Sequence, residues 1–77
     1  MLVERLILGD VDLDEKVKIQ DATLIQKFAA KLSTLEGNGF ITADVTGDGK
    51  INVKDATAIQ KYLAKIETPY NIGEYIF

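Results

Sequence analysis

Acidic side chains gather in two short segments of this sequence, and their spacing suits the coordination of a hard metal ion. Calcium loops place oxygen ligands at positions 1, 3, 5, 7 and 12, with a backbone carbonyl at position 7 and often a water-bridged side chain at position 9. Residues 44–55 follow that spacing, which predicts a calcium site. Its predicted ligands are Asp44, Thr46, Asp48, Lys50 through its carbonyl oxygen, Asn52 and Asp55.

Two features of this second loop support the prediction. Gly49 falls at position 6, where the sharp turn favours a residue that tolerates positive φ. Asn52 can also cap the helix that follows, with Asp55 three residues later in the register of a capping box. The metal ligands, the turn and the start of a helix therefore agree within one short segment.

Residues 10–21 form a first copy of the loop, with more negative charge and a less favourable backbone. Glu15 replaces the turn glycine, which costs about 1–2 kcal/mol if the turn is left-handed. Lys18 stands at position 9 and has no acceptor with which to cap a helix or hold a water-bridged cation. Four ligand carboxylates, against three in the second loop, favour calcium affinity. We predict two Ca2+ sites without ranking them. The first-loop ligands are Asp10, Asp12, Asp14, Lys16 through its carbonyl oxygen, and Asp21.

Other interpretations of the aspartates explain less of the pattern. An isolated Asp-x-Asp usually marks a solvated turn or a helix cap, but here two copies stand in register, each followed by the same helical pattern. Magnesium demands stricter octahedral geometry and keeps several waters. A glycosidase needs two carboxylates flanking a sugar in a cleft, and a domain of 77 residues offers neither the cleft nor spare acids. No catalytic residues are predicted, so we do not expect an enzyme.

The chain is an internal repeat. Residues 10–32 align with residues 44–66 at a shift of 34, with 12 identities in 23 positions. In the second half of each copy, apolar residues recur at i, i+3, i+4 and i+7, which places one apolar stripe along a helix. We expect two helices that bury these stripes against each other about a pseudo-twofold axis. The stripes are Ile25, Phe28, Ala29 and Leu32, and Ile59, Tyr62, Leu63 and Ile66.

The whole chain is predicted to form one domain. The turn signal Gly37-Asn38-Gly39 lies between the two copies, and Pro69 stops the second helix from continuing. The expected fold is all-α: a small duplicated calcium-loop–helix fold, with two antiparallel main helices and a short connecting helix. Its parts are repeat 1 (about 9–32), a connector (33–43), repeat 2 (about 44–66) and a C-terminal extension (67–77).

Composition makes a metal the natural way to stabilise so small a domain. Domains of this length bury only about 60% of the surface that the unfolded chain exposes, and small folds recruit disulfides, metals or partners. The sequence has no cysteine and no histidine, which excludes disulfides and imidazole chemistry. The net charge of −3 argues against nucleic acid or an anionic membrane as partner. The apolar start, residues 1–8, lacks the features of a signal peptide and of a membrane span.

Two loops that are each followed by one helix, with no helix expected before the first, resemble dockerin modules. The loops close in Asp21 and Asp55 rather than in Glu. The repeat length, the shared segment Asp-Ala-Thr-x-Ile-Gln-Lys-[Phe/Tyr] and the tail Tyr-Asn-Ile-Gly-Glu are similar to type I-like dockerins of cellulosome-producing gut anaerobes. The departures from the usual loop pattern are Glu15, Lys18 and Thr46.

The resemblance implies a non-catalytic, calcium-dependent docking module that binds a cohesin module of a scaffoldin or cell-surface protein. Such a module is a monomer alone and a heterodimer with cohesin. It anchors a secreted enzyme or scaffold protein in an extracellular, cell-surface-associated complex that degrades polysaccharides. The cohesin-facing residues carried over from the family are Ile19, Gln20, Thr23, Leu24, Lys27 and Lys31 in the first copy, and Val53, Lys54, Thr57, Ala58, Lys61 and Lys65 in the second.

Three expectations stay open at this point. Because Thr23, Lys27 and Lys31 are identical to their counterparts in the second copy, one cohesin could dock in two orientations about half a turn apart. The differences Leu24/Ala58 and Gln20/Lys54 could bias docking toward one orientation. The apolar start, Leu6 to Leu8, is expected to meet Pro69, Tyr70 and Tyr75. The alternative function is an EF-hand-type calcium sensor or buffer. A sensor opens an apolar, often Met-rich groove, whereas this sequence has one methionine.

Overall fold

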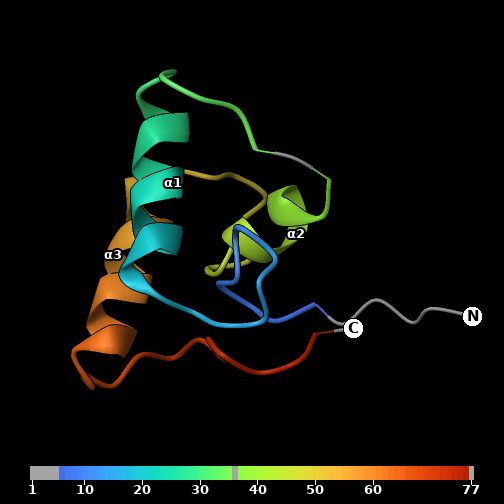
Figure 1. Ribbon diagram of the computed structural model, residues 1–77. Helices are drawn as coiled ribbons and strands as arrows, with labels where there is room; N and C mark the ends of the chain where they lie inside the picture. The colour runs from blue at the N-terminus through green and yellow to red at the C-terminus, as the bar shows by residue number, and fades with distance from the viewer. Residues whose placement is uncertain (1–5, 36, 77) are drawn as a thin grey trace, which may run out of the picture.

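The computed structural model describes residues 6–35 and 37–76. Three helices form in these residues: α1 (Ile19–Ala29), α2 (Gly39–Ala43) and α3 (Val53–Leu63). Figure 1 shows α1 and α3 running in opposite directions against each other, with α2 beside the pair. The expected all-α fold with a short connecting helix is thereby confirmed. None of the described helices has the length and apolar character that crossing a membrane requires.

The third residue of each main helix is an aspartate whose side chain faces back into its own loop. The Asp55 carboxylate accepts the Asn52 N–H at 2.9 Å, and the Asn52 side chain accepts the Lys54 N–H at 2.9 Å. In the first copy the Asp21 carboxylate accepts the Lys18 N–H at 2.7 Å. The Lys18 ammonium has no acceptor to return the second bond of a capping box. Loop closure and helix initiation therefore depend on the same two carboxylates.

Both main helices end earlier than the predicted apolar stripes required. α1 stops at Ala29, and Lys31 adopts a left-handed φ of 61°. The Leu32 N–H then donates to the Lys27 carbonyl at 2.8 Å, which is the reversal of a Schellman motif. The corresponding residues at the end of α3 are Leu63, Lys65 (φ 62°), Ile66 and Lys61.

The buried face of the helices consequently differs from the prediction. Ile25 and Ile59 are fully buried, as expected. Leu32 is 75% exposed and Ile66 is 56% exposed, because both residues lie beyond the helix ends. The remaining stripe residues are half-buried or exposed: Phe28, Ala29, Tyr62 and Leu63.

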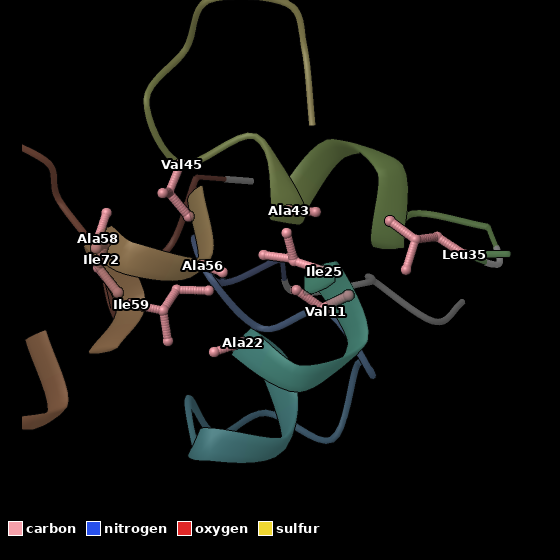
Figure 2. Packing of buried hydrophobic residues seen from close by; sticks show 10 residues of the cluster. All are labelled: Val11, Ala22, Ile25, Leu35, Ala43, Val45, Ala56, Ala58, Ile59 and Ile72. Atoms are coloured by element: carbon pink, nitrogen blue, oxygen red, sulfur yellow. The ribbon is translucent and has the colours of Figure 1, made fainter. Parts of the chain in front are cut away.

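The core joins both helices, α2, both loops and the tail, as Figure 2 shows. Residues at matching positions of the two repeats supply most of it, and Ala22 and Ala56 let the helices approach closely. Ile72 of the tail has no partner in the repeat pattern. The ten residues of the cluster are Val11, Ala22, Ile25, Leu35, Ala43, Val45, Ala56, Ala58, Ile59 and Ile72.

The first and last described segments of the chain, residues 6–8 and 73–76, lie side by side in antiparallel register. Ile7 and Tyr75 form an antiparallel β-bridge. The Leu8 N–H donates to the Glu74 carbonyl at 3.0 Å, and the Leu8 carbonyl accepts the Gly73 N–H at 2.8 Å. The contact expected between the apolar start and the tail therefore exists, although its hydrogen bonds involve residues 73–76 rather than Pro69 and Tyr70. We call this pairing of residues 6–8 with 73–76 the terminal ribbon.

Candidate metal loops and partner face

Three carboxylates of the first loop converge on one point. Asp10, Asp12 and Asp21 each offer an oxygen, and these atoms lie within 4.8 Å of one another. Backbone N–H groups hold the carboxylates in place. Those of Asp14 and Glu15 donate to Asp10 at 3.1 and 2.8 Å. Hard oxygen ligands crowded in this way fit a calcium ion, which takes six to eight oxygens.

Burial disfavours the ionised form of these carboxylates when no cation is bound. Burial raises the pKa of Asp10 to about 6 and that of Asp21 to about 6, against the lowering effect of backbone N–H donors. Burial also raises the pKa of Asp55 in the second loop. A divalent cation would favour the charged form of each group.

Asp14, a predicted first-loop ligand, is not one of these three carboxylates, although its side chain interacts with those of Asp10 and Asp12. The Lys18 ammonium lies 2.5 Å from Asp14 Oδ2. This contact is the main reason that the pKa of Asp14 is lowered, and it raises the pKa of Lys18. Asp14 also accepts the Lys16 N–H at 3.0 Å, so its two oxygens already have protein partners.

The second loop contains a buried hydroxyl oxygen that lacks a well-formed hydrogen bond. Thr46 Oγ1, at loop position 3, is buried and makes no hydrogen bond of normal geometry. The hydroxyl lies beside Asp48, whose pKa is lowered first by the Lys50 N–H and then also by Thr46 and Asp44. A buried, unpartnered oxygen beside carboxylates is costly unless a cation uses it. The residues of this loop therefore also fit the predicted metal.

The loop backbones differ at two left-handed positions. The second loop has glycine at both, Gly47 with φ 73° and Gly49 with φ 82°. The first loop has Leu13 with φ 61° and Glu15 with φ 70°. The strain predicted at Glu15 is thus present, and Leu13 carries the same strain, which was not predicted.

Sequence reasoning also missed the residues of α2 that support the first loop. The buried Thr42 hydroxyl donates to the Asp10 carbonyl at 2.7 Å, and the Gly9 N–H donates to the Thr42 carbonyl at 2.9 Å. A Cβ atom on Gly39 would lie 2.8 Å from the Val11 carbonyl oxygen, so α2 needs glycine there. No local signal marks these residues, because the Thr42–Asp10 contact spans 32 positions.

Most residues carried over as cohesin-facing lie at the surface. Ile19 is 57% exposed and Val53 is 59% exposed at the starts of α1 and α3. Leu24 is half-buried. Ala58 departs from the expectation, because it is only 5% exposed and packs in the core with Ile72. The remaining residues of the set are exposed: Gln20, Thr23, Lys27, Lys31, Lys54, Thr57, Lys61 and Lys65.

The surroundings of the two partner faces are not the same. A groove lies against α3 and is lined by Val53, Thr57 and Lys61 of the helix and by Pro69 and Tyr70 of the tail. Lys31 and Lys65 lie beyond the helices, on the left-handed turns. The tail therefore breaks the repeat symmetry on the side of the second copy.

Comparison with known proteins agrees with the duplicated loops and helices. No curated protein matches the chain. Two similar solved structures contain the ScaB dockerin of Acetivibrio cellulolyticus in complex with the third cohesin of ScaC, one with a mutation in the C-terminal helix and one with a mutation in the N-terminal helix (both IN to SI). The first is 35% identical, with a TM-score of 0.77, and the match covers 90% of this chain and 97% of that one. The second is 36% identical, with a TM-score of 0.74, over 79% and 88%.

The family comparison covers both loops and both main helices. The model of the dockerin type I domain matches residues 8–67. That range runs from the terminal ribbon, through both aspartate loops, to the turn that follows α3. The chain belongs to the dockerin type I family.

Proposed function

We propose that this chain is a calcium-dependent docking module that binds a cohesin and so attaches the protein that carries it to a cellulosome-like complex. The observation that carries the proposal is the family match over residues 8–67, together with similar structures of dockerins bound to cohesin. The module itself would contribute binding rather than catalysis. Its place of action would be outside the cell or at the cell surface.

Calcium would set the positions of the two helices that the partner contacts. Asp21 and Asp55 each lie in the first turn of a helix and also accept backbone hydrogen bonds from the loop before it. A cation held in each loop would therefore fix the start of the helix that follows, α1 after the first loop and α3 after the second. Metal binding and folding are coupled in such small domains, because the site does not exist in the unfolded chain. We keep the metal ligands predicted from the sequence. They are Asp10, Asp12, Asp14, Lys16 and Asp21 in the first loop, and Asp44, Thr46, Asp48, Lys50, Asn52 and Asp55 in the second, with Lys16 and Lys50 contributing their carbonyl oxygens.

The alternative of a calcium sensor has less support. A sensor moves an entering helix against an exiting helix when calcium binds. Residues 6–9, which lead into the first loop, are not helical and pair with the tail instead. The second loop is preceded only by the short α2, Gly39–Ala43.

The test is binding of the free module to the cohesins encoded in the same genome as this chain. Isothermal titration calorimetry in millimolar calcium should detect one cohesin that binds at 1:1 stoichiometry. Excess chelator should abolish that binding. If no cohesin binds while circular dichroism shows a folded, calcium-loaded module, the proposed function is wrong.

The partner surface is proposed to be the exposed faces of α1 and α3, used one at a time. Lys27 and Lys61 occupy matching exposed positions on these helices. If cohesin can dock in either orientation, K27E or K61E alone should weaken binding by less than about tenfold, because the other face remains. The double variant should lose binding. Loss of binding in one single variant alone would show that only that face is used.

A further inference from the structure

The first loop contains its own cation. Lys18, at loop position 9, places its ammonium on the carboxylate of Asp14, at loop position 5. Both side chains are partly exposed, at 43% and 33%. Among the described residues this is the one ion pair of the molecule, and it lies inside a predicted calcium loop. It uses a carboxylate that the ion would need.

The second loop has the opposite arrangement at the matching positions. Asn52 replaces Lys18, and its side chain accepts the Lys54 N–H at 2.9 Å. Asp48 replaces Asp14 and has no ion-pair partner among the residues that the structure describes. The buried Thr46 hydroxyl beside it is unsatisfied. The second loop therefore presents one buried hydroxyl without a hydrogen bond and a carboxylate, Asp48, without an ion pair, whereas in the first loop the matching carboxylate is already paired with an ammonium.

The backbone conformations of the two loops also favour calcium binding at the second loop over the first. Both left-handed positions of the second loop are glycines, whereas the first loop holds Leu13 and Glu15 there. Left-handed geometry costs about 1–2 kcal/mol for each residue that has a Cβ atom. If calcium binding orders the loop, part of its binding free energy at the first loop offsets that strain.

We propose that Lys18 is an internal competitor for calcium, so that the two loops bind calcium with unequal affinity and the second loop fills first. The proposal rests on the calcium dependence of the proposed function. Calcium at the first loop would have to displace the Lys18 ammonium from Asp14. Lys18 offsets one of the four carboxylate charges, and the charge advantage that the sequence gives the first loop is then removed. The first loop would then be the site that empties first when the calcium concentration falls.

The test measures calcium binding to the free module, without cohesin. Titration of the 15N-labelled protein with CaCl2 follows the two loops separately by NMR, through the Gly47 and Gly49 amides in the second loop and the Leu13 and Glu15 amides in the first. Signals of the second loop should change first. K18M removes the ammonium and adds no ligand. Because an exposed ion pair contributes up to about 1 kcal/mol and the cations also repel each other, K18M should tighten the first site about three- to tenfold.

Two controls separate this effect from general electrostatics. K18R keeps the cation and should leave the first site within about twofold of wild type. The second loop is an internal control, because a general change in net charge would tighten both sites equally. In the reciprocal pair, N52K should weaken the second site more than N52M, which loses the same helix cap without adding a cation.

Each outcome decides the question. If the first loop fills before the second, or if K18M leaves the first site unchanged, the proposal is wrong. Equal tightening at both loops would also contradict it. A wild-type protein that binds one calcium ion, at the second loop, and gains the other in K18M would support it. If neither loop bound calcium, the proposed function would lose its calcium requirement, whereas a failure confined to the order of filling would leave cohesin docking untouched.

Discussion

Two lysines hold the positions that end the main helices. Lys31 and Lys65 both adopt left-handed φ angles, of 61° and 62°. Glycine is the usual residue at this position of a Schellman motif, because a Cβ atom is disfavoured there. The same strained choice occurs in both repeats, and both side chains are exposed on the proposed partner surface. Residues with a Cβ atom therefore adopt the left-handed conformation both at the helix ends and in the first loop.

Substitution of these lysines by glycine should stabilise the free module. K31G and K65G should each raise the free energy of unfolding by about 0.5–1 kcal/mol, because glycine adopts the left-handed conformation without the Cβ penalty. Urea unfolding at saturating calcium would measure the change. The matched controls are K27G and K61G, which place glycine inside a helix and should destabilise by about 1 kcal/mol. A loss of stability in K31G and K65G would contradict the reversal described at the helix ends.

The terminal ribbon stabilises the two repeats, although it is not itself part of the repeated unit. It pairs residues 6–8 with residues 73–76 through three backbone hydrogen bonds, those of the Leu8 N–H, the Leu8 carbonyl and the Ile76 N–H. The tail also brings Ile72 into the core, where it packs close to Gly9 at the start of the first loop. The tail is therefore a structural element, and it also forms one wall of the groove on α3.

Loss of the Ile72 side chain should reveal this role. Ile72 is 4% exposed, so I72A should lower the free energy of unfolding by about 2–4 kcal/mol through lost burial and the remaining cavity. I76A is the matched control, because Ile76 is 39% exposed although its N–H pairs with the Leu6 carbonyl at 2.8 Å. It should cost less than about 1 kcal/mol. Thermal unfolding monitored by circular dichroism would compare the two, and equal effects would mean that the tail is not anchored by Ile72.

At the scale of the whole molecule, the core is small and the buried acids are central to it. Ten side chains form the cluster, and several of them are alanines. Asp10, Asp21 and Asp55 are almost completely buried next to these residues. A domain of this size has little apolar burial to offset such charges. Calcium at a hundredfold excess over the dissociation constant would add about 2.7 kcal/mol for each site.

The calcium-free protein should therefore become more stable on mild acidification. The pKa values of Asp10 and Asp21 are raised from 3.8 to about 6 in the folded state. Between these values the two carboxyl groups bind more protons in the folded chain than in the unfolded chain, so their contribution to stability is fully present below about pH 4 and is lost as pH rises through 6. In calcium-depleted buffer, the thermal midpoint should be higher at pH 5 than at pH 7. Saturating calcium should raise the midpoint at pH 7. A calcium-free midpoint that falls between pH 7 and pH 5 would contradict the burial of these acids.

The sequence by itself determined the features that are encoded among near neighbours. The ligand spacing of residues 10–21 and 44–55, the glycine turn at Gly49, the Asn52 cap and the repeat all lie within short segments, and the family and the fold followed from them. The predicted calcium ligands and partner residues remain predictions, which the loop geometry and the exposure of every partner residue except Ala58 and the half-buried Leu24 support.

Only the tertiary structure decided the contacts between segments that are far apart in the sequence. The α2 support of the first loop through Thr42, the terminal ribbon and the burial of Ala58 against the tail have no local signature. The apolar pattern also predicted helices that are too long. Apolar spacing continues to Leu32 and Ile66, but the backbone already reverses at Lys31 and Lys65. Periodicity states which side chains could share a face. Burial depends on what the rest of the chain brings to cover them.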